Sequence, residues 1–150
     1  MARLTINEAG TSGYTDEIIL TPNDFTTAAG NTTTVVNVPI KKGDVIDGAA
    51  INVTEVYSTG SATVKVGTDS GSGVNDDDGL ITATRVDQLN TVANSGSRLV
   101  VTGADGGAAT DTARLVATGD GNVVITASTA LNGDTTGKLR ILLSIKRITF

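Results

Sequence analysis

The sharpest chemical feature of the sequence is a segment rich in Gly, Ser and Asp at residues 67–79. Clustered carboxylates with amide and backbone oxygens are the ligands that Ca²⁺ prefers. In an alignment with an EF-hand loop, Asp78 and Asp76 occupy the fifth and third ligand positions, but Val74 occupies the first. No helical pattern flanks the segment. We therefore predict a solvated loop between two strands, with a calcium site as the alternative.

Catalysis by carboxylates is the other chemistry that these residue types allow. Glycoside hydrolysis needs two carboxyl groups about 5–10 Å apart, and the chain contains three Glu. Glu55 is the candidate because it interrupts the apolar face of a predicted strand, although a bulge near Gly48 or the strand's end would place it in solvent. The chain has no His and no Cys, so it lacks the usual proton shuttle and thiol nucleophile. We predict no enzyme, no catalytic residue, no metal and no cofactor, with a glycosidase that uses Glu55 as an alternative.

Basic residues concentrate near the end of the sequence. Four of the eleven lie in the 13 residues from 138 to 150, which contain no acid; they are Lys138, Arg140, Lys146 and Arg147. Two interpretations stay open: a solvated strand face offset by acidic loops, or a docking surface for an acidic partner. The net charge of −5 predicts no nucleic-acid partner. No apolar run approaches the roughly 20 residues of a membrane span, and no secretory signal pattern opens the sequence, which predicts synthesis in a cytoplasm.

The composition favours a fold made of strands. The chain has 25 Thr, 18 Gly and only four aromatic residues, and Thr suits a pleated, half-buried surface while Gly suits turns. Segments with period-two alternation recur between turn residues, which predicts eight or nine strands in an all-β, antiparallel, jelly-roll-like sandwich. We expect them at residues 16–20, 32–40, 44–57, 61–67, 80–84, 98–102, 112–117, 122–128 and 137–150.

Several local features follow from the same patterns. The clearest alternation, in residues 137–150, directs Leu139, Ile141, Leu143 and Ile145 inward and predicts a central strand. Residues 44–57 and 61–67 are expected to form a hairpin, with a bulge at Gly48. Residues 85–97 are expected to contain one or two helical turns.

The sequence divides into an N-terminal arm at residues 1–13 and a sandwich domain at residues 14–150. A core built mostly from Val, Ile, Leu and Ala is thin, so we expect further burial between subunits. Ile148 and Phe150 are the predicted subunit contacts, because they lie on the polar side of the last strand.

The order of these segments resembles a known family. An apolar strand leads through Val38-Pro39-Ile40-Lys41-Lys42-Gly43-Asp44-Val45-Ile46 into Ile51–Tyr57 and then into Ala62–Asp69. A Gly-rich region and a last strand beginning Gly137-Lys138-Leu139-Arg140-Ile141 complete the succession. Over residues 14–150 it is similar to the capsid decoration (cement) and head-fibre proteins of tailed bacteriophages.

The resemblance implies a structural virion protein that binds the outer surface of the head and stabilises the lattice of the major capsid protein. It also implies a homo-oligomer, most simply a trimer, and no catalytic residues. In that setting Arg3, Leu4 and Ile6 of the arm are the predicted capsid contacts. The alternative is a tail- or fibre-associated module that recognises a host glycan, for which Tyr14 and Tyr57 are the only tyrosines that could serve as platforms.

Overall fold

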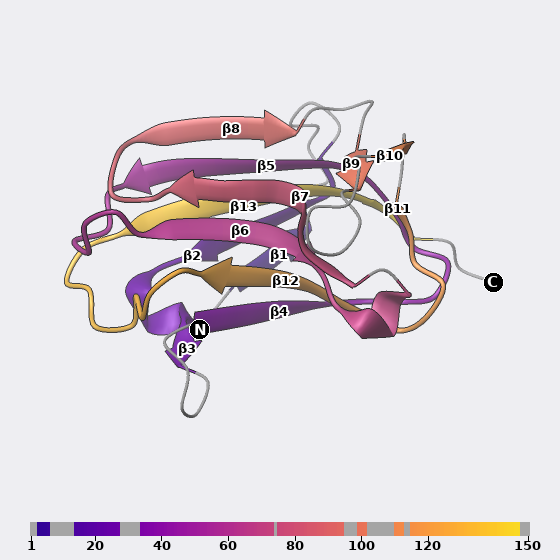
Figure 1. The fold of residues 1–150 in the computed structure, drawn as a ribbon, viewed down its shortest axis with the longest axis horizontal. Helices are drawn as coiled ribbons and strands as arrows, with labels where there is room; N and C mark the ends of the chain where they lie inside the picture. The colour runs from indigo at the N-terminus through magenta and orange to yellow at the C-terminus, as the bar shows by residue number, and fades with distance from the viewer. Residues whose placement is uncertain are drawn as a thin grey trace.

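The computed structural model describes residues 3–6, 14–27, 34–73, 75–94, 99–101, 110–112 and 115–147. In these residues the regular structure consists of antiparallel strands and two single-turn 3₁₀ helices, η1 (Pro22–Asp24) and η2 (Ser70–Ser72). The strands form two sheets that pack face to face (Figure 1). The prediction of an all-β antiparallel sandwich is therefore confirmed.

The first sheet is built around the last strand of the chain. Its order is β1 (Arg3–Ile6), β2 (Asp16–Leu20), β13 (Lys138–Lys146) and β5 (Val45–Glu55). The far edge of β5 pairs with two shorter strands, β8 (Asn90–Asn94) and β11 (Leu115–Val116), at different points along its length.

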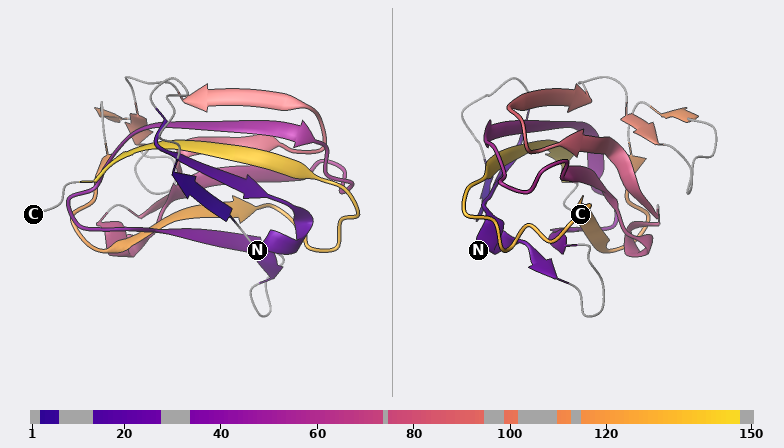
Figure 2. Two further views of the ribbon diagram at one scale, coloured as in Figure 1. Left: turned by 180° about the vertical axis from the view of Figure 1, so that it is seen from behind. Right: turned by 60° about the vertical axis from the view of Figure 1, so that its left-hand side comes forward.

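The second sheet has the order β3 (Thr26–Thr27), β4 (Thr34–Ile40), β12 (Gly121–Ala127), β6 (Thr63–Thr68) and β7 (Asp76–Arg85). A separate antiparallel pair, β9 (Leu99–Val101) and β10 (Thr110–Thr112), lies outside both sheets. The turned view on the right of Figure 2 shows the two sheets enclosing the space between them.

The topology is that of a jelly roll. Strands β2, β13, β5 and β8 form one four-stranded layer, and β4, β12, β6 and β7 form the layer opposite. The chain crosses between the layers after β2, β4, β5, β7, β11 and β12, which interleaves two Greek keys in the manner of a jelly roll. Strands β1, β3 and β11 only extend the edges of these layers.

The core lies between the layers and follows the predicted stripe. Leu139, Ile141, Leu143 and Ile145 are all buried, and β13 lies between β2 and β5, so the expectation of a central strand is confirmed. Ile141 is the register partner of Ile18 on one side and Ile51 on the other. Burying such aliphatic side chains contributes about 1.5–3 kcal/mol each, which is the main stabilising term available to a chain without disulfides.

The predicted hairpin between residues 44–57 and 61–67 is wrong. Strands β5 and β6 lie in different sheets, and residues 56–62 carry the chain across the end of the sandwich. Val86 holds this crossing in place: its carbonyl accepts from Tyr57 N at 2.9 Å, and its N–H donates to Ala62 O at 3.0 Å. Alternation identifies which face of a strand is buried, but it does not identify the strand's partner.

Three other segments differ from the sequence prediction. Residues 85–97 contain no helical turn where the structure describes them: Val86 is buried, Leu89 is 71% exposed, and β8 follows at Asn90–Asn94. Strand β7 begins at Asp76 and not at residue 80. The expected strand at residues 112–117 is divided between β10 and β11.

The bulge predicted at Gly48 is present. Gly48 pairs with Ser144 and Ile46 pairs with Ile145, so that Asp47 is the extra residue on β5. A second shift in register makes Thr54 an extra residue between Val53 and Glu55. Because the extra Thr54 reverses the alternation after the buried Val53, Glu55 turns to solvent at the end of β5.

Two of the aromatic rings close one end of the core. Tyr57 and Phe25 are both buried and meet edge to face, with ring centroids 6.1 Å apart and planes at 86°. The Tyr57 hydroxyl donates to the backbone carbonyl of Leu20 at 3.0 Å. Burial raises the pKa of Tyr57 well above its usual value, and the charges of nearby carboxylates add to this effect. The hydroxyl therefore stays protonated and acts as a donor.

Removing this hydroxyl tests its contribution. Tyr57→Phe keeps the ring but leaves the buried Leu20 carbonyl without this donor, so the free energy of unfolding should fall by about 1–2 kcal/mol. Urea unfolding followed by circular dichroism measures the change. An unchanged midpoint would mean that the hydrogen bond adds nothing to stability.

Candidate interaction surface

The predicted capsid contacts lie at an edge of the first sheet. Arg3, Leu4 and Ile6 belong to β1, whose backbone pairs with β2 from Arg3 opposite Ile19 to Ile6 opposite Asp16. Figure 2 shows β1 beside β2. Within one chain, this part of the predicted arm is therefore an edge strand. Its contact with a capsid stays a prediction. The rest of the arm lies outside the described residues, as do the predicted subunit contacts Ile148 and Phe150.

The basic residues of the last strand are mostly paired with acids. Three of the four make ion pairs: Arg140 Nε with Glu17 Oε1 at 2.5 Å, Lys146 Nζ with Asp47 Oδ2 at 2.6 Å, and Arg147 with Asp16 at 2.8 Å. This arrangement favours the solvated-face interpretation over a surface of unpaired positive charge. The pairs of the half-exposed bases contribute at most about 1 kcal/mol each.

Asp16 is the exception among these acids because its side chain is fully buried. Both of its oxygens accept from the guanidinium of Arg147, at 2.8 and 3.2 Å. A buried carboxylate without such a partner would be costly. This bidentate ion pair therefore connects the end of β13 to the start of β2.

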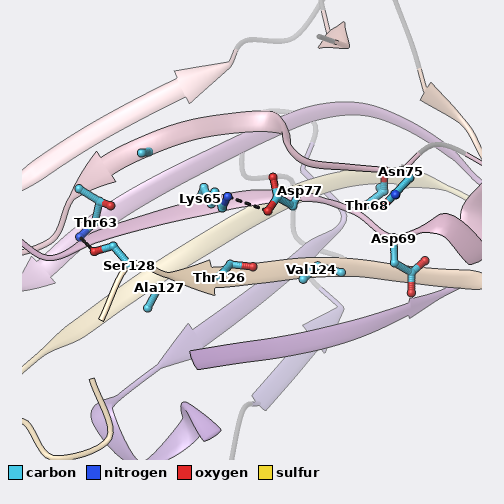
Figure 3. Close-up of a pocket in the computed structure, with 11 residues that line it drawn as sticks. Thr63, Lys65, Thr68, Asp69, Asn75, Asp77, Val124, Thr126, Ala127 and Ser128 are labelled. Carbon is cyan, nitrogen blue, oxygen red and sulfur yellow. Dashed lines mark hydrogen bonds and ion pairs between the residues drawn. The ribbon is translucent and has the colours of Figure 1, made fainter. Parts of the chain in front are cut away.

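The second sheet carries a groove on its outer face. This groove, of about 520 Å³, runs over β6, β7 and β12 (Figure 3). Its floor is made of small or β-branched side chains such as Thr63, Val124 and Thr126. Lys65 and Asp77 pair across it, with Nζ and Oδ2 2.6 Å apart. The charged side chains that line the groove are Lys65, Asp69 and Asp77.

The Asp-rich segment is more ordered than the predicted solvated loop. Strand β6 continues to Thr68, η2 follows, and β7 begins at Asp76. Asp69 caps η2: its carboxylate accepts from Asn122 N at 2.9 Å, Asn122 Nδ2 at 2.8 Å and Ser72 N at 3.4 Å. The described residues contain no group of three acidic side chains placed to hold a metal ion. The carboxylates of Asp69 and Asp77 are instead bonded to donors of the protein.

The contacts of Asp69 also determine its acidity. Burial is the largest effect and raises its pKa, but hydrogen bonds from Asn122, Ser72 and Gly71 together outweigh burial. The pKa of Asp69 is therefore lowered from its ordinary value of 3.8. The hydrogen bonds from Asn122, Ser72 and Gly71 therefore favour the charged form of the Asp69 carboxylate.

Asp69 belongs to a set of three loops that brace one end of the sandwich. These loops are residues 41–44, 69–73 and 117–122. Asp120 joins the first to the third: its carboxylate accepts from Lys42 N at 2.9 Å and lies 3.3 Å from Lys41 Nζ. Gly121 joins the second to the third, and a Cβ there would lie 2.3 Å from Ser72 N. The close backbone approach makes this end rigid.

The residues required by the alternative functions are placed unfavourably for them. Tyr57 is buried, which leaves Tyr14, half-buried, as the only tyrosine that could contact a glycan. Glu55 is exposed at the end of β5. Among the described residues, no helix is long and apolar enough to span a membrane.

Comparison with known proteins adds no assignment. No family model matches the chain, and no curated protein or solved structure matches it.

Proposed function

We propose that this chain is a capsid decoration protein of a tailed bacteriophage, which binds the outer surface of the head and stabilises the lattice of the major capsid protein. The observation that carries the proposal is the jelly-roll order of its eight principal strands, an architecture common among viral capsid proteins. The sequence resemblance over residues 14–150 is a second support for the proposal. Because one fold serves many functions, the proposal also draws on the molecule's surfaces.

The surfaces of the molecule support binding to a capsid lattice without any reaction. The outer faces carry balanced ion pairs and a groove with Lys65 and Asp77 paired across it, and the brace of three loops makes one end stiff. A stiff body transmits load between the lattice sites that it bridges. In a trimer, several weak contacts act together, because each attachment raises the effective concentration of the next.

The contact residues of this proposal are Arg3, Leu4 and Ile6 toward the capsid, and Ile148 and Phe150 toward neighbouring subunits. An edge strand such as β1 is a suitable element for a capsid contact, because one row of its backbone groups faces away from its own sheet. The location would be the outer surface of the virion, after synthesis in the host cytoplasm.

Replacing Arg3, Leu4 and Ile6 by Ser should abolish binding to heads while the sandwich stays folded. The assay is co-sedimentation with expanded heads of the encoding phage, prepared without this protein. The control replaces Asn37, Thr82 and Ala83 by Ser, because all three are exposed on the second sheet. The mass in solution is measured for each variant, and a trimer is expected.

Two results would overturn the proposal. One is that the unaltered protein does not sediment with heads. The other is that it binds a glycan array and not heads, which would support the tail- or fibre-associated alternative. If heads are bound equally by both variants, the capsid contact lies elsewhere than β1.

A further inference from the structure

The connection between β12 and β13 exposes the one Asn-Gly sequence of the chain, Asn132-Gly133. It is the tip of a turn closed by a hydrogen bond from Asp134 N to Leu131 O at 3.0 Å. A Cβ added at Gly133 would meet nothing within 4 Å. In the described part of the chain, no hydrogen bond holds the Asn132 side chain or the Gly133 N–H. Both groups are thus free to move relative to each other.

We propose that Asn132 is a site of spontaneous deamidation, a modification that requires no enzyme. The Gly133 backbone nitrogen loses its proton to hydroxide and attacks Cγ of Asn132. The side-chain NH₂ takes a proton from water and leaves as ammonia, which closes the five-membered succinimide and regenerates the hydroxide. Water then opens the ring at one of its two carbonyls. Opening at the side-chain carbonyl gives Asp, and opening at the backbone carbonyl gives isoaspartate. Glycine favours the attack because it has no side chain to hinder ring closure.

The fold makes this reaction selective among the asparagines. Asn122 is the sharpest contrast: its Nδ2 donates to Asp69 Oδ2 at 2.8 Å and its N–H donates to Asp69 Oδ1 at 2.9 Å. The next residue, Val123, is β-branched, buried and paired within β12. Rigid strand geometry keeps the Val123 nitrogen away from the position needed for attack. Asn132 should therefore react long before Asn122.

The two products should affect the turn differently. Leu131 anchors one side of the turn in the core. On the other side, the Asp134 carboxylate accepts from Thr59 N at 3.0 Å and Thr59 Oγ1 at 2.5 Å. Asp at position 132 adds one negative charge and leaves the backbone unchanged. Isoaspartate adds a backbone carbon between Leu131 and Asp134, which shifts the Asp134 carboxylate away from Thr59.

The test incubates the full chain in mildly alkaline and mildly acidic buffer. Proteolytic digestion and mass spectrometry then locate the mass increase that accompanies replacement of NH₂ by OH. We expect it at Asn132 before any other asparagine, and faster in the alkaline buffer, with isoaspartate and Asp separated by chromatography. The control is Gly133→Ala, which the open space around Gly133 accommodates, and it should lose most of the signal.

Each outcome decides the proposal. Earlier conversion at Asn122, no conversion at Asn132, or equal rates in Gly133→Ala would overturn it. Asn132→Asp supplies one product directly and should unfold at the same urea concentration as the unaltered chain. A lower midpoint in the purified isoaspartate form supports the account of the turn, and an unchanged midpoint contradicts that account.

Discussion

Gly137→Ala should lower the free energy of unfolding by about 2–5 kcal/mol, because it combines backbone strain with overpacking. Gly137 has a φ of +139°, a conformation that residues with a side chain rarely adopt. A Cβ at this position would lie 2.5 Å from Cδ1 of Tyr57. The ring has no space to retreat into, because it packs against Phe25 and is held at its hydroxyl by Leu20.

The measurement is urea unfolding, and Gly133→Ala is its matched control. Both glycines lie in the same connection between β12 and β13, but Gly133 has open space around it. Its replacement should change stability by less than about 0.5 kcal/mol, as expected for an unconstrained surface position. If both variants unfolded at the same urea concentration, the contact of Gly137 with Tyr57 would not be a constraint on the fold.

The sequence predicted the layers of this fold better than the connections between them. The stripe from Leu139 to Ile145 identified both the last strand and its buried face, because alternation is imposed by the pleat of a single strand. The pairing of strands depends on contacts between distant segments. The proximity of β5 and β6 in the sequence suggested a hairpin, whereas β5 pairs with β13, β8 and β11. The prediction of a jelly-roll-like sandwich was based on the number of strands and not on which strands pair.

The state of the surface charges was likewise not fixed by local sequence. Residues 138–150 contain no acid, which left a basic docking face open. The structure brings Asp47 to Lys146 and Glu17 to Arg140 from other strands. Alternation also failed to predict the position of Glu55, because the second bulge in β5, at Thr54, reverses the alternation after Val53. The capping role of Asp69 was not predicted, although an Asp before a Ser-Gly-Ser turn is typical of a cap.

Asp69→Asn should lower the free energy of unfolding by about 1–3 kcal/mol, because it removes one of two acceptor oxygens that face protein donors. The amide that replaces this oxygen is itself a donor and would face Asn122 or Ser72. The volume of the side chain is almost unchanged, so the loss reports hydrogen bonding and not a cavity. Asp77→Asn is the control, because Asp77 is exposed and its pair with Lys65 contributes at most about 1 kcal/mol.

The same variant predicts a dependence on pH. The pKa of Asp69 in the folded chain is lower than its ordinary value of 3.8, so the folded state favours the charged form more than the unfolded state does. The contribution of Asp69 to the free energy of unfolding is complete above its pKa in the unfolded chain. This contribution is lost as the pH falls through its lower pKa in the folded chain. The difference in stability between the unaltered chain and Asp69→Asn should therefore be constant near neutrality and shrink in strong acid. A difference that grew on acidification would show that the protonated form of Asp69 is the one that joins η2 to β12.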